Sequence, residues 1–588
     1  MKPTVPGPVG WFCVAVVVGA IPAWGYVADS NATGVVRRWA LEVPDNRVKA
    51  SSVNAATRAI IYRLDPAGYS AAGAVAELQS IRAAFDQWQA ISGARVKFEE
   101  GPGIPGVTEV NSQDHTNSVF WARSLTINGG RDNLRGILAL TYVASFRDGN
   151  VIFDADTVFN GVEYGWSTNP EEPMGQKAFV EAIALHEAGH LLGLQHSPVG
   201  GATMLVAGDF GMNVQLGLSA DELAAARGMY PSSDGAGRVG RVTGRVSASG
   251  QPVFGAAVFA ENTLGELVSG TVSAADGNYS LGGLPTGTIV VRTAPLDPAT
   301  ALNYLVRGVD ISTAYSGAQT TYAPSADRSA TVSGGGTTRN IDFEVVGGVP
   351  PRIVRLMRPA DDLGAPAFTP YPIGVKPDGR RRYLGVLTSA KAGPDLRLEV
   401  TGGGFELGTT EILTNVVPGL TLVAMPATLA TNTPPGLRSL RLRNGTQTGW
   451  AHGFLEILPP FPDANGDGLD DGFQRKYWTR FTAPEAGPSS DPDLDGFSNT
   501  WEFQTGSIPT NAASAHFEVL SVRVTGAGSV VRSQAAKGKR FRLLGRDAWD
   551  GAAWETVGAP VTAAGDTVEF QDPSATRVVR FYRVEKVP

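Results

Sequence analysis

The chain has 588 residues, 43% of them hydrophobic and 18% charged, which is the composition of an ordinary globular protein of about four domains. Its formal net charge of −7 argues against a nucleic-acid-binding protein, which would usually carry a basic patch. The 72 glycines and 39 prolines are typical of short strands joined by turns rather than of long helices.

Residues 1–25 have the pattern of a signal peptide. Lys2 precedes an apolar run over residues 10–21 that is too short to span a membrane, and a small-residue cleavage site follows near residues 23–25. We therefore expect a secreted, extracellular protein; a buried strand or an uncleaved anchor is the alternative. The single cysteine, Cys13, lies in this segment, so the mature chain would have no disulfide. No second apolar span follows, so no transmembrane segment is expected in the mature chain.

The first third of the chain has the pattern of an α/β domain. Helices are expected over residues 75–91, where apolar residues recur every three or four positions, and over the Ala-, Leu- and His-rich residues 179–194. Ser219 and Glu222 form a capping box that begins another helix, which ends before Pro231. Short apolar or alternating runs predict strands at residues 59–64, 95–99, 118–121 and 151–153.

After Pro231 the composition changes to Val- and Thr-rich runs separated by glycine turns, which predicts several all-β modules. A polar linker at residues 232–237 begins this part, and few contacts are expected to cross it, so that a chain ending near Gly235 would fold alone. The expected segments are a β-sandwich at 239–347, a β-rich module at 350–458, an acidic stretch at 461–511 and a β-domain at 516–588.

The segment from His186 to His196 carries the clearest chemistry. His186 and His190 are four residues apart, so both imidazoles project from one face of a helix toward a single ion. Gly193 can end that helix in a left-handed conformation, and His196 then approaches from another side. Three nitrogen ligands favour zinc and leave its fourth position open for a water, which Glu187 can activate as general base. A helix that carries these histidines by chance is the alternative.

This segment resembles the extended zinc motif of the metzincin metalloproteases, and further residues narrow the resemblance to the matrixins. Ser197 follows the third histidine, residues 202–204 resemble the Met-turn, and residues 218–230 resemble the closing matrixin helix. The resemblance covers residues 38–231 and implies an α/β zincin-like catalytic domain. It also implies a hydrolase, a secreted metalloendopeptidase that uses a catalytic Zn²⁺ to cleave protein or peptide substrates.

The same resemblance supplies further site residues. Met204 would lie beneath the zinc site, and Met212 is a weaker candidate for that place. Residues 153–159 resemble the strand before the zinc helix, where acidic residues of matrixins contribute to a calcium site. Asp154 and Asp156 are therefore candidate calcium ligands, with a solvated strand end as an equal alternative.

Two features of animal matrixins are missing from the sequence. The only other histidine in the matrixin-like region is His115, so a second, histidine-held structural zinc is not expected. We expect no latency through a zinc-bound cysteine, because no cysteine switch is seen and residues 26–37 are few for a prodomain.

The β-rich modules carry weaker resemblances. Residues 241–292 resemble the carboxypeptidase regulatory-like domain, a small sandwich that usually binds or spaces, and residues 350–458 are similar to an immunoglobulin-like sandwich. The last module resembles terminal β-domains of large secreted bacterial proteins. Its Trp549 and Trp554 are expected to be buried core residues, and a lectin groove that uses them is the alternative. Through these modules the protein would contact cell-surface or extracellular-matrix components.

The acidic stretch contains two candidate calcium loops. Residues 491–502 fit the twelve-residue EF-hand loop, in which alternate oxygen ligands surround one Ca²⁺ and a glycine permits the sharp turn. Residues 463–474 repeat the spacing with Gln474 in the last place, which should weaken that site. The pair resembles dockerin-like and thrombospondin type 3-like repeats; two Asp/Gly turns in a linker are the alternative. The candidate structural calcium ligands are Asp491, Asp493, Asp495, Asn499, Glu502, Asp463, Asn465, Asp467 and Asp471.

The sequence therefore leaves two alternative functions. The first is a zinc endopeptidase in which Glu187 activates the attacking water. The second is a non-enzymatic surface or adhesion protein that carries a protease-like domain. The intact Glu187 and all three histidines favour the enzyme, because a decayed protease would be expected to lose the base or a ligand.

Overall fold

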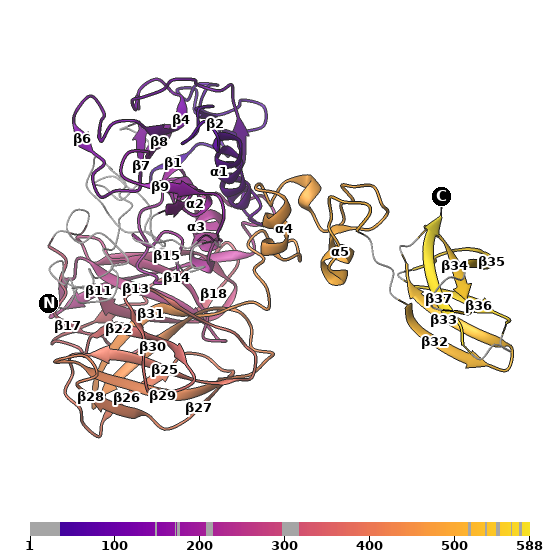
Figure 1. The fold of residues 1–588 in the computed structure, drawn as a ribbon. Helices are drawn as coiled ribbons and strands as arrows, with labels where there is room; N and C mark the ends of the chain where they lie inside the picture. The colour runs from indigo at the N-terminus through magenta and orange to yellow at the C-terminus, as the bar shows by residue number, and fades with distance from the viewer. Residues whose placement is uncertain are drawn as a thin grey trace, which may run out of the picture. The chain divides into compact units, whose positions relative to one another are not determined.

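The computed structural model describes residues 36–146, 150–170, 172, 177–206, 216–296, 315, 317–514, 519–535, 538–548, 553–565, 567–574 and 579–587. The expected signal peptide with Cys13, and also Met212 and Trp549, lie outside the described residues. The chain divides into two units, Met1–Asn465 and Gly466–Pro588 (Figure 1). None of the helices in the described part of the chain is long and apolar enough to cross a bilayer.

A six-stranded sheet forms the centre of the first 231 residues. Its strands lie in the order β1 (Arg38–Trp39), β8 (Val151–Asn160), β4 (Asn117–Ala122), β2 (Ile60–Leu64) and β3 (Phe98–Glu100), and β7 (Ala139–Ser145) also pairs with β8. All neighbours are parallel except β7, which is antiparallel to β8. The four strands expected from the sequence are confirmed, with β3 displaced toward the C-terminus. Strand β7 was not expected. Short pairs add β5 (Thr126–Ile127), β6 (Asp132–Asn133), β9 (Gly165–Ser167) and β10 (Lys177–Phe179).

The three expected helices are confirmed as α1 (Ala74–Gln89), α2 (Val180–Leu191) and α3 (Ala220–Met229). Helix α1 packs along α2, and the Trp88 indole N–H donates to the carbonyl of Leu185 over 2.9 Å. Helix α3 begins with the expected capping box of Ser219 and Glu222. The apolar faces of the helices and the sheet share one hydrophobic core.

Residues 239–347 and 350–458, which we call modules A and B, are each built from two packed sheets. In module A the main strands are β11 (Val239–Ala248), β12 (Gln251–Pro252), β13 (Ala256–Asn262), β14 (Leu267–Val272), β15 (Asn278–Pro285), β16 (Gly287–Pro295) and β18 (Arg328–Val332). Its short strands are β17 (Tyr322–Ala323), β19 (Thr337–Thr338), β20 (Phe343–Glu344) and β21 (Val346–Gly347). A core of valines and leucines lies between the sheets.

Module B has a six-stranded sheet facing a four-stranded sheet across its own core. The first sheet contains β22 (Ile353–Ala360), β23 (Phe368–Thr369), β25 (Arg381–Thr388), β27 (Phe405–Leu407), β28 (Glu411–Thr414) and β29 (Thr421–Leu429). The second contains β24 (Ile373–Val375), β26 (Leu396–Val400), β30 (Gly436–Asn444) and β31 (Gln447–Ile457).

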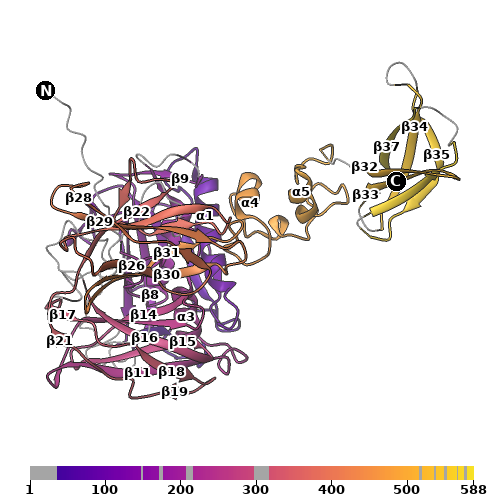
Figure 2. The same ribbon diagram turned by 90° about the horizontal axis from the view of Figure 1, so that it is seen from below.

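The expectation that few contacts cross the 232–237 linker is wrong. Helix α3 packs against β14 and β15 of module A, and these elements lie side by side in Figures 1 and 2. Gly283 of β15 has φ +63°, and a Cβ at that position would overlap the carbonyl of Ala224. Val199 and Ala202 share a buried cluster with residues of both modules. The polar linker is therefore a connection within one packed body.

The second unit begins with three short helical segments, α4 (Asp471–Tyr477), η1 (Pro484–Ala486) and α5 (Asn499–Thr505). Its β-domain has two three-stranded sheets, formed by β32 (Val519–Thr525), β33 (Gly528–Gln534), β34 (Arg540–Arg546), β35 (Glu555–Thr562), β36 (Thr567–Asp572) and β37 (Phe581–Val587). Phe497, from the loop before α5, is buried in the core of this β-domain.

Candidate metal centre

Helix α2 and the turn after it bring the three predicted histidines together. His186 and His190 approach from the helix, and His196 approaches from the chain that follows the turn. His186 and His190 lie one turn apart on α2, which ends at Leu191. Gly193 follows with φ +93°, and a Cβ there would lie 2.5 Å from the carbonyl oxygen of Arg37. Glycine is required at this position for both reasons, and the turn that it permits brings His196 back toward the helix.

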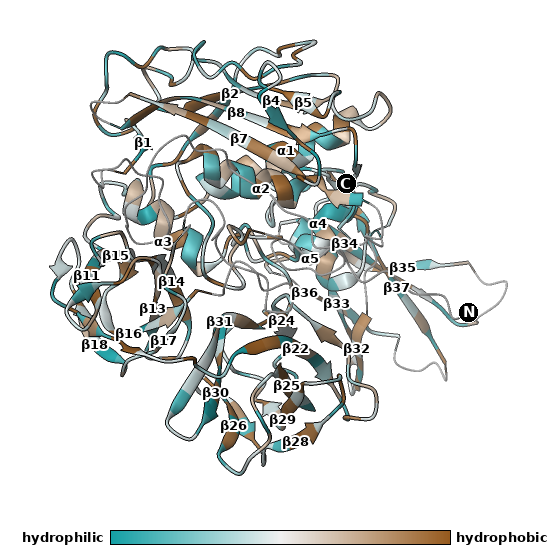
Figure 3. Cartoon of the chain, turned by 90° about the vertical axis from the view of Figure 1, so that its left-hand side faces the viewer, coloured by the Kyte–Doolittle hydropathy of each residue, from teal (hydrophilic) through white to brown (hydrophobic). Residues whose placement is uncertain are grey.

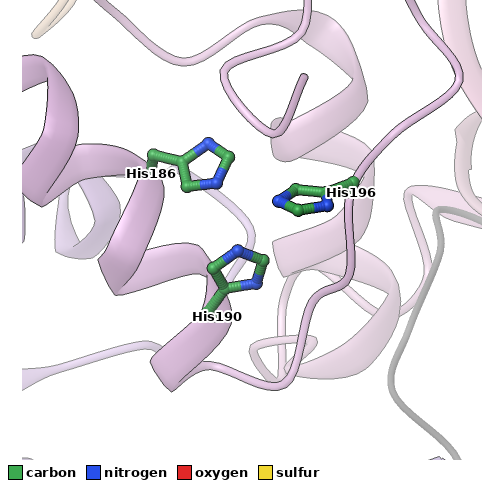
Figure 4. A group of neighbouring side chains, drawn as sticks. All are labelled: His186, His190 and His196. Carbon is green, nitrogen blue, oxygen red and sulfur yellow. The ribbon is translucent and has the colours of Figure 1, made fainter. Parts of the chain in front are cut away.

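The three histidines converge, as Figure 4 shows. One ring nitrogen from each lies within 4.8 Å of those of the other two, and all three residues are buried. The Nε2 atoms of His186, His190 and His196 have no hydrogen-bond partner among the described residues. Buried polar atoms are nearly always satisfied, so three unsatisfied ring nitrogens around one space fit a bound cation. Imidazole donors at this spacing suit zinc.

Hydrogen bonds and burial prepare the histidines for that role. The Nδ1–H of His186 donates to the Thr203 carbonyl over 2.8 Å, and that of His190 donates to the Leu194 carbonyl over 2.7 Å. These bonds leave the Nε2 lone pairs available to a metal. Burial lowers the pKa of His186 to about 4 and holds the pKa values of His190 and His196 well below 6.5. The imidazoles are thus neutral, as metal ligands must be.

Glu187 is held from the sheet side of the site. Its Oε2 accepts a 2.6 Å hydrogen bond from the hydroxyl of Thr141 on β7, and that hydroxyl lies 2.9 Å from the hydroxyl of Thr157 on β8. Glu187 itself is only 1% exposed. Figure 3 shows β7 between β8 and α2. Because β7 pairs only with β8 in the described sheet, it forms the edge of the sheet beside the candidate base.

Met204 lies against α2, and its expected place beneath a zinc ion stays a prediction. A Cβ at Gly189 would overlap Met204 Sδ, so the thioether packs directly on the α2 backbone between the two candidate ligands in the sequence. The backbone N–H of Met204 donates to Glu222 Oε1 over 2.9 Å, which connects this turn to the start of α3.

Asp154 and Asp156 lie apart from the histidines on β8, both buried. Asp156 accepts hydrogen bonds from the backbone N–H groups of Asn111 and Ser118, at 2.8 and 2.9 Å. Asp154 accepts from Thr116 over 3.1 Å, and burial together with Asp156 raises its pKa to about 8. These bonds attach the 111–118 segment to β8, which is a structural role, and the calcium role stays a prediction.

Of the two calcium loops, residues 491–502 have the stronger geometry. Carboxylate oxygens of Asp491, Asp493 and Asp495 come within 4.8 Å of one another. Glu502 is fully buried, and its Oε2 has no hydrogen-bond partner among the described residues. The buried Asn499 likewise has an unsatisfied Oδ1, while its Nδ2 donates to two backbone carbonyls. Burial and the neighbouring aspartates raise the pKa of Glu502 to about 7.

The loop over residues 463–474 is arranged differently. Asp463 and Asn465 belong to the end of the first unit, whereas Asp467 and Asp471 belong to the second. Gln474 donates from Nε2 to Asp467 Oδ2 over 2.8 Å, and Asp471 pairs with Arg475 at 3.3 Å. An amide N–H and a guanidinium thus face two of the carboxylates that would bind a cation.

The roles of three residues at the candidate zinc site were not anticipated from the sequence. Thr141 holds Glu187, the Thr203 carbonyl holds His186, and Asp221 accepts a 2.6 Å hydrogen bond from the hydroxyl of Ser197, next to His196. Thr141 lies in an unremarkable strand sequence, so no local signal marks it. The acidic residues at the start of α3 were recognised in the sequence, but only as part of a helix cap.

Comparison with solved structures gives only weak overall likenesses. The extracellular portion of mouse CD200RLa matches at 7% identity and TM-score 0.11, covering 38% of this chain and 96% of that chain. Domains A168–A170 from titin match at 9% identity and TM-score 0.12, covering 56% of this chain and 82% of that chain. A chimeric titin Z1Z2 matches at 10% identity and TM-score 0.11, covering 38% of this chain and 97% of that chain. These scores are too low to support any argument.

No curated protein sequence matches the chain. The family comparison is informative for one region, which contains α1–α3, most of the parallel sheet and all three histidines. Residues 55–231 match the matrixin family, and this match supports a matrixin-type zinc metalloprotease domain in that part of the chain.

Proposed function

We propose that the protein is a secreted zinc-dependent endopeptidase in which Glu187 acts as general base and general acid. The observation that carries this proposal is the convergence of three buried, unsatisfied Nε2 atoms. Glu187 follows the first of these histidines in the chain, and Thr141 holds its carboxylate in place. The match of residues 55–231 to the matrixins supports the same reaction class.

His186, His190 and His196 would hold the ion. A zinc ion bound there supplies Lewis acidity that makes water more acidic and polarises the scissile carbonyl. Glu187 takes a proton from the attacking water while the oxygen of that water bonds to the carbonyl carbon. Glu187 then gives that proton to the amide nitrogen as the C–N bond breaks, so the products are a carboxylic acid and an amine. Thr141 keeps the carboxylate oriented through both transfers.

The substrate class follows from the strand beside the base. Strand β7 is at the edge of its sheet and carries Thr141 directly against Glu187. An extended peptide that adds to this edge would bring successive peptide bonds past the carboxylate. We therefore propose unfolded or loop segments of proteins as substrates rather than small amides.

The deciding experiment measures zinc content and peptide cleavage together. Purified protein should contain about one zinc per chain, and 1,10-phenanthroline should abolish cleavage of a peptide library. Glu187→Ala should keep the zinc and lose about 10²–10⁴-fold in kcat, because only proton transfer is removed. The matched variant Glu163→Ala, at an exposed position in the turn after β8, should cleave normally. Full activity of Glu187→Ala would overturn the assignment.

The alternative is a non-enzymatic adhesion protein with a protease-like domain. It predicts zinc binding without cleavage of any peptide in the library, whereas the endopeptidase predicts discrete cuts that require Glu187. The same experiment therefore separates the two functions.

We also propose that residues 491–502 bind one structural Ca²⁺. Support comes from the three clustered aspartates together with the buried, unsatisfied Glu502 Oε2 and Asn499 Oδ1. Gly496 has φ +97° at the sixth place of the loop, where the EF-hand pattern requires a sharp turn. The 463–474 loop, with Gln474 in the last place, is expected to bind Ca²⁺ more weakly.

A further inference from the structure

Modules A and B contact the zinc site through the segment that follows His196. We call residues 197–206 the post-zinc loop. We infer that modules A and B are part of the scaffold of the zinc centre, and that Leu437 and Phe454 of module B and Gly270 of module A are positioning residues for its ligands. This inference rests on the proposed function.

One side of the post-zinc loop supports the ligands. The Thr203 carbonyl accepts the 2.8 Å hydrogen bond from His186 Nδ1 and so sets the plane of that imidazole. Met204 packs beneath Gly189, between the two ligands of α2. Ser197 N–H donates to the Met204 carbonyl over 2.8 Å, which closes the loop on itself. A shift of this loop would therefore move His186 and His196 together.

The other side of the loop is covered by module B. The Gly200 N–H donates to the His452 carbonyl of β31 over 2.9 Å. A Cβ at Gly200 would overlap the Phe454 ring, and one at Gly201 would overlap the Leu437 side chain. Neither glycine has a positive φ, so close approach by module B, rather than backbone conformation, is what requires a residue without a side chain here.

Hydrophobic burial extends this contact to module A. Val199 and Ala202 are both fully buried, and they share a cluster with Phe259 and Leu267 of module A and Leu437 of module B. At the far end of the loop, Val206 packs with Tyr371 of module B. Without the modules, these apolar side chains of the loop would face water.

A buried carboxylate adds a polar connection to module A. Asp221 of α3 accepts a 2.6 Å hydrogen bond from the Ser197 hydroxyl at Oδ2 and a 2.8 Å hydrogen bond from the Gly270 N–H of β14 at Oδ1. A Cβ at Gly270 would lie 2.6 Å from Val199 Cγ2, so β14 also touches the loop directly. One carboxylate thus joins the residue after His196 to a strand of module A.

These contacts give the modules a role in the reaction that a spacer would not have. Residues that orient metal ligands from behind change metal affinity and rate when they are altered, although they touch neither metal nor substrate. We expect the same of the module residues that fix the post-zinc loop.

The test uses two leucines of β30 in the full chain. Leu437 faces the post-zinc loop, whereas Leu442 is buried in the core of module B itself. Leu437→Ala should weaken zinc binding, measured by competition with a chromophoric chelator, by about 10–100-fold. It should lower kcat more than it raises KM, and it should alter the visible spectrum of the Co²⁺-loaded protein. Leu442→Ala should leave zinc affinity and the Co²⁺ spectrum unchanged even where it lowers the melting temperature.

Further variants keep the test decisive. Leu437→Met should restore most of the zinc affinity, and Phe454→Leu replaces Leu437→Ala if the latter does not fold. Equal zinc affinity and identical Co²⁺ spectra in the Leu437 and Leu442 variants would overturn the inference. The metal readouts do not depend on peptide cleavage. A wild-type protein that binds zinc but cuts nothing would therefore contradict the proposed function and leave this test intact.

Discussion

Thr141 is the residue on which the orientation of the candidate base depends. Its hydroxyl is 2.6 Å from Glu187 Oε2 and 2.9 Å from the Thr157 hydroxyl, so the carboxylate is fixed to β7 and through it to β8. A hydrogen bond to a charged group contributes about 1.5–3 kcal/mol, and here its effect is geometric as well, since the base must face a water.

We therefore expect Thr141→Val to reduce kcat by about tenfold or more while the zinc content stays at one per chain. Valine has the shape of threonine but cannot donate, so packing against α2 is preserved. Thr141→Ser restores the hydroxyl and should recover most of the rate. Steady-state kinetics with metal analysis checks this, and equal rates for the valine and serine variants would mean that Thr141 does not orient the base.

The histidines carry a second prediction at the residue scale, on pH. Burial lowers the pKa of His186 to about 4 and places those of His190 and His196 well below 6.5, so the metal-free folded protein already holds neutral imidazoles at pH 6. Zinc binding at pH 6 should then release almost no protons, whereas three ordinary histidines would release about two. Titration calorimetry in buffers of different ionisation enthalpy measures this number.

The same shifts fix how stability of the metal-free protein depends on pH. The folded-state pKa values are below the unfolded value of 6.5, so the unfolded chain takes up protons that the folded chain cannot. The histidines therefore destabilise the fold progressively as the pH falls below about 6.5. A release of two protons at pH 6 would contradict both expectations.

At the scale of elements, local patterns predicted those parts of the site that depend on local sequence. Helices α1, α2 and α3 follow from periodicity and capping, and the turn at Gly193 follows from the spacing of the histidines. Strand β7 was missed because Ala139–Ser145 has no clear alternation, and its place is set by pairing with β8. The contact of the modules with Gly200 and Gly201 is also non-local, and the linker after Pro231 suggested the opposite.

The turn between α2 and His196 offers a test with a matched control. Gly193 and Gly136 both have positive φ, +93° and +74°, but only a Cβ at Gly193 would meet another atom, the Arg37 carbonyl. Gly193→Ala should combine backbone strain with this clash, cost about 1–3 kcal/mol of unfolding free energy and weaken zinc binding. Gly136→Ala should show the strain alone and keep its zinc affinity. Urea denaturation and zinc competition measure both, and equal zinc affinity in the two variants would show that the turn does not position His196.

At the scale of the whole molecule, each of the two units has its own candidate metal. The first unit has the candidate zinc ligands, and the second has the candidate calcium loop over residues 491–502. Phe497 of that loop is buried among Val531, Phe541 and Phe570 of the C-terminal β-domain. Phe497 is therefore both a residue of the calcium loop and a residue of that core. Calcium that orders the loop should consequently stabilise the β-domain of the same unit.

Glu502 determines how that stabilisation depends on pH. Burial and the nearby Asp493 and Asp495 raise its pKa to about 7, so in the metal-free protein its charged form is disfavoured by the fold. A folded pKa above the unfolded value of 4.5 means that this group destabilises the metal-free unit increasingly as the pH rises from about 4.5 through 7. Bound Ca²⁺ reverses the effect, because it attracts the carboxylates that otherwise repel one another.

We therefore expect chelation of calcium at pH 8 to lower the melting temperature of the second unit and to open residues 461–511 to proteolysis, with the zinc content unchanged. The loss should be smaller at pH 5.5, because Glu502 of the metal-free protein is then protonated and calcium must displace that proton to bind. Glu502→Gln removes the bidentate carboxylate and should make the melting temperature insensitive to calcium, whereas Glu485→Gln, at an exposed position nearby, should respond like the unaltered chain. Differential scanning calorimetry with limited proteolysis checks these outcomes. If the melting temperature of the unaltered chain does not change with calcium at pH 8, residues 491–502 are an acidic turn and not a calcium site.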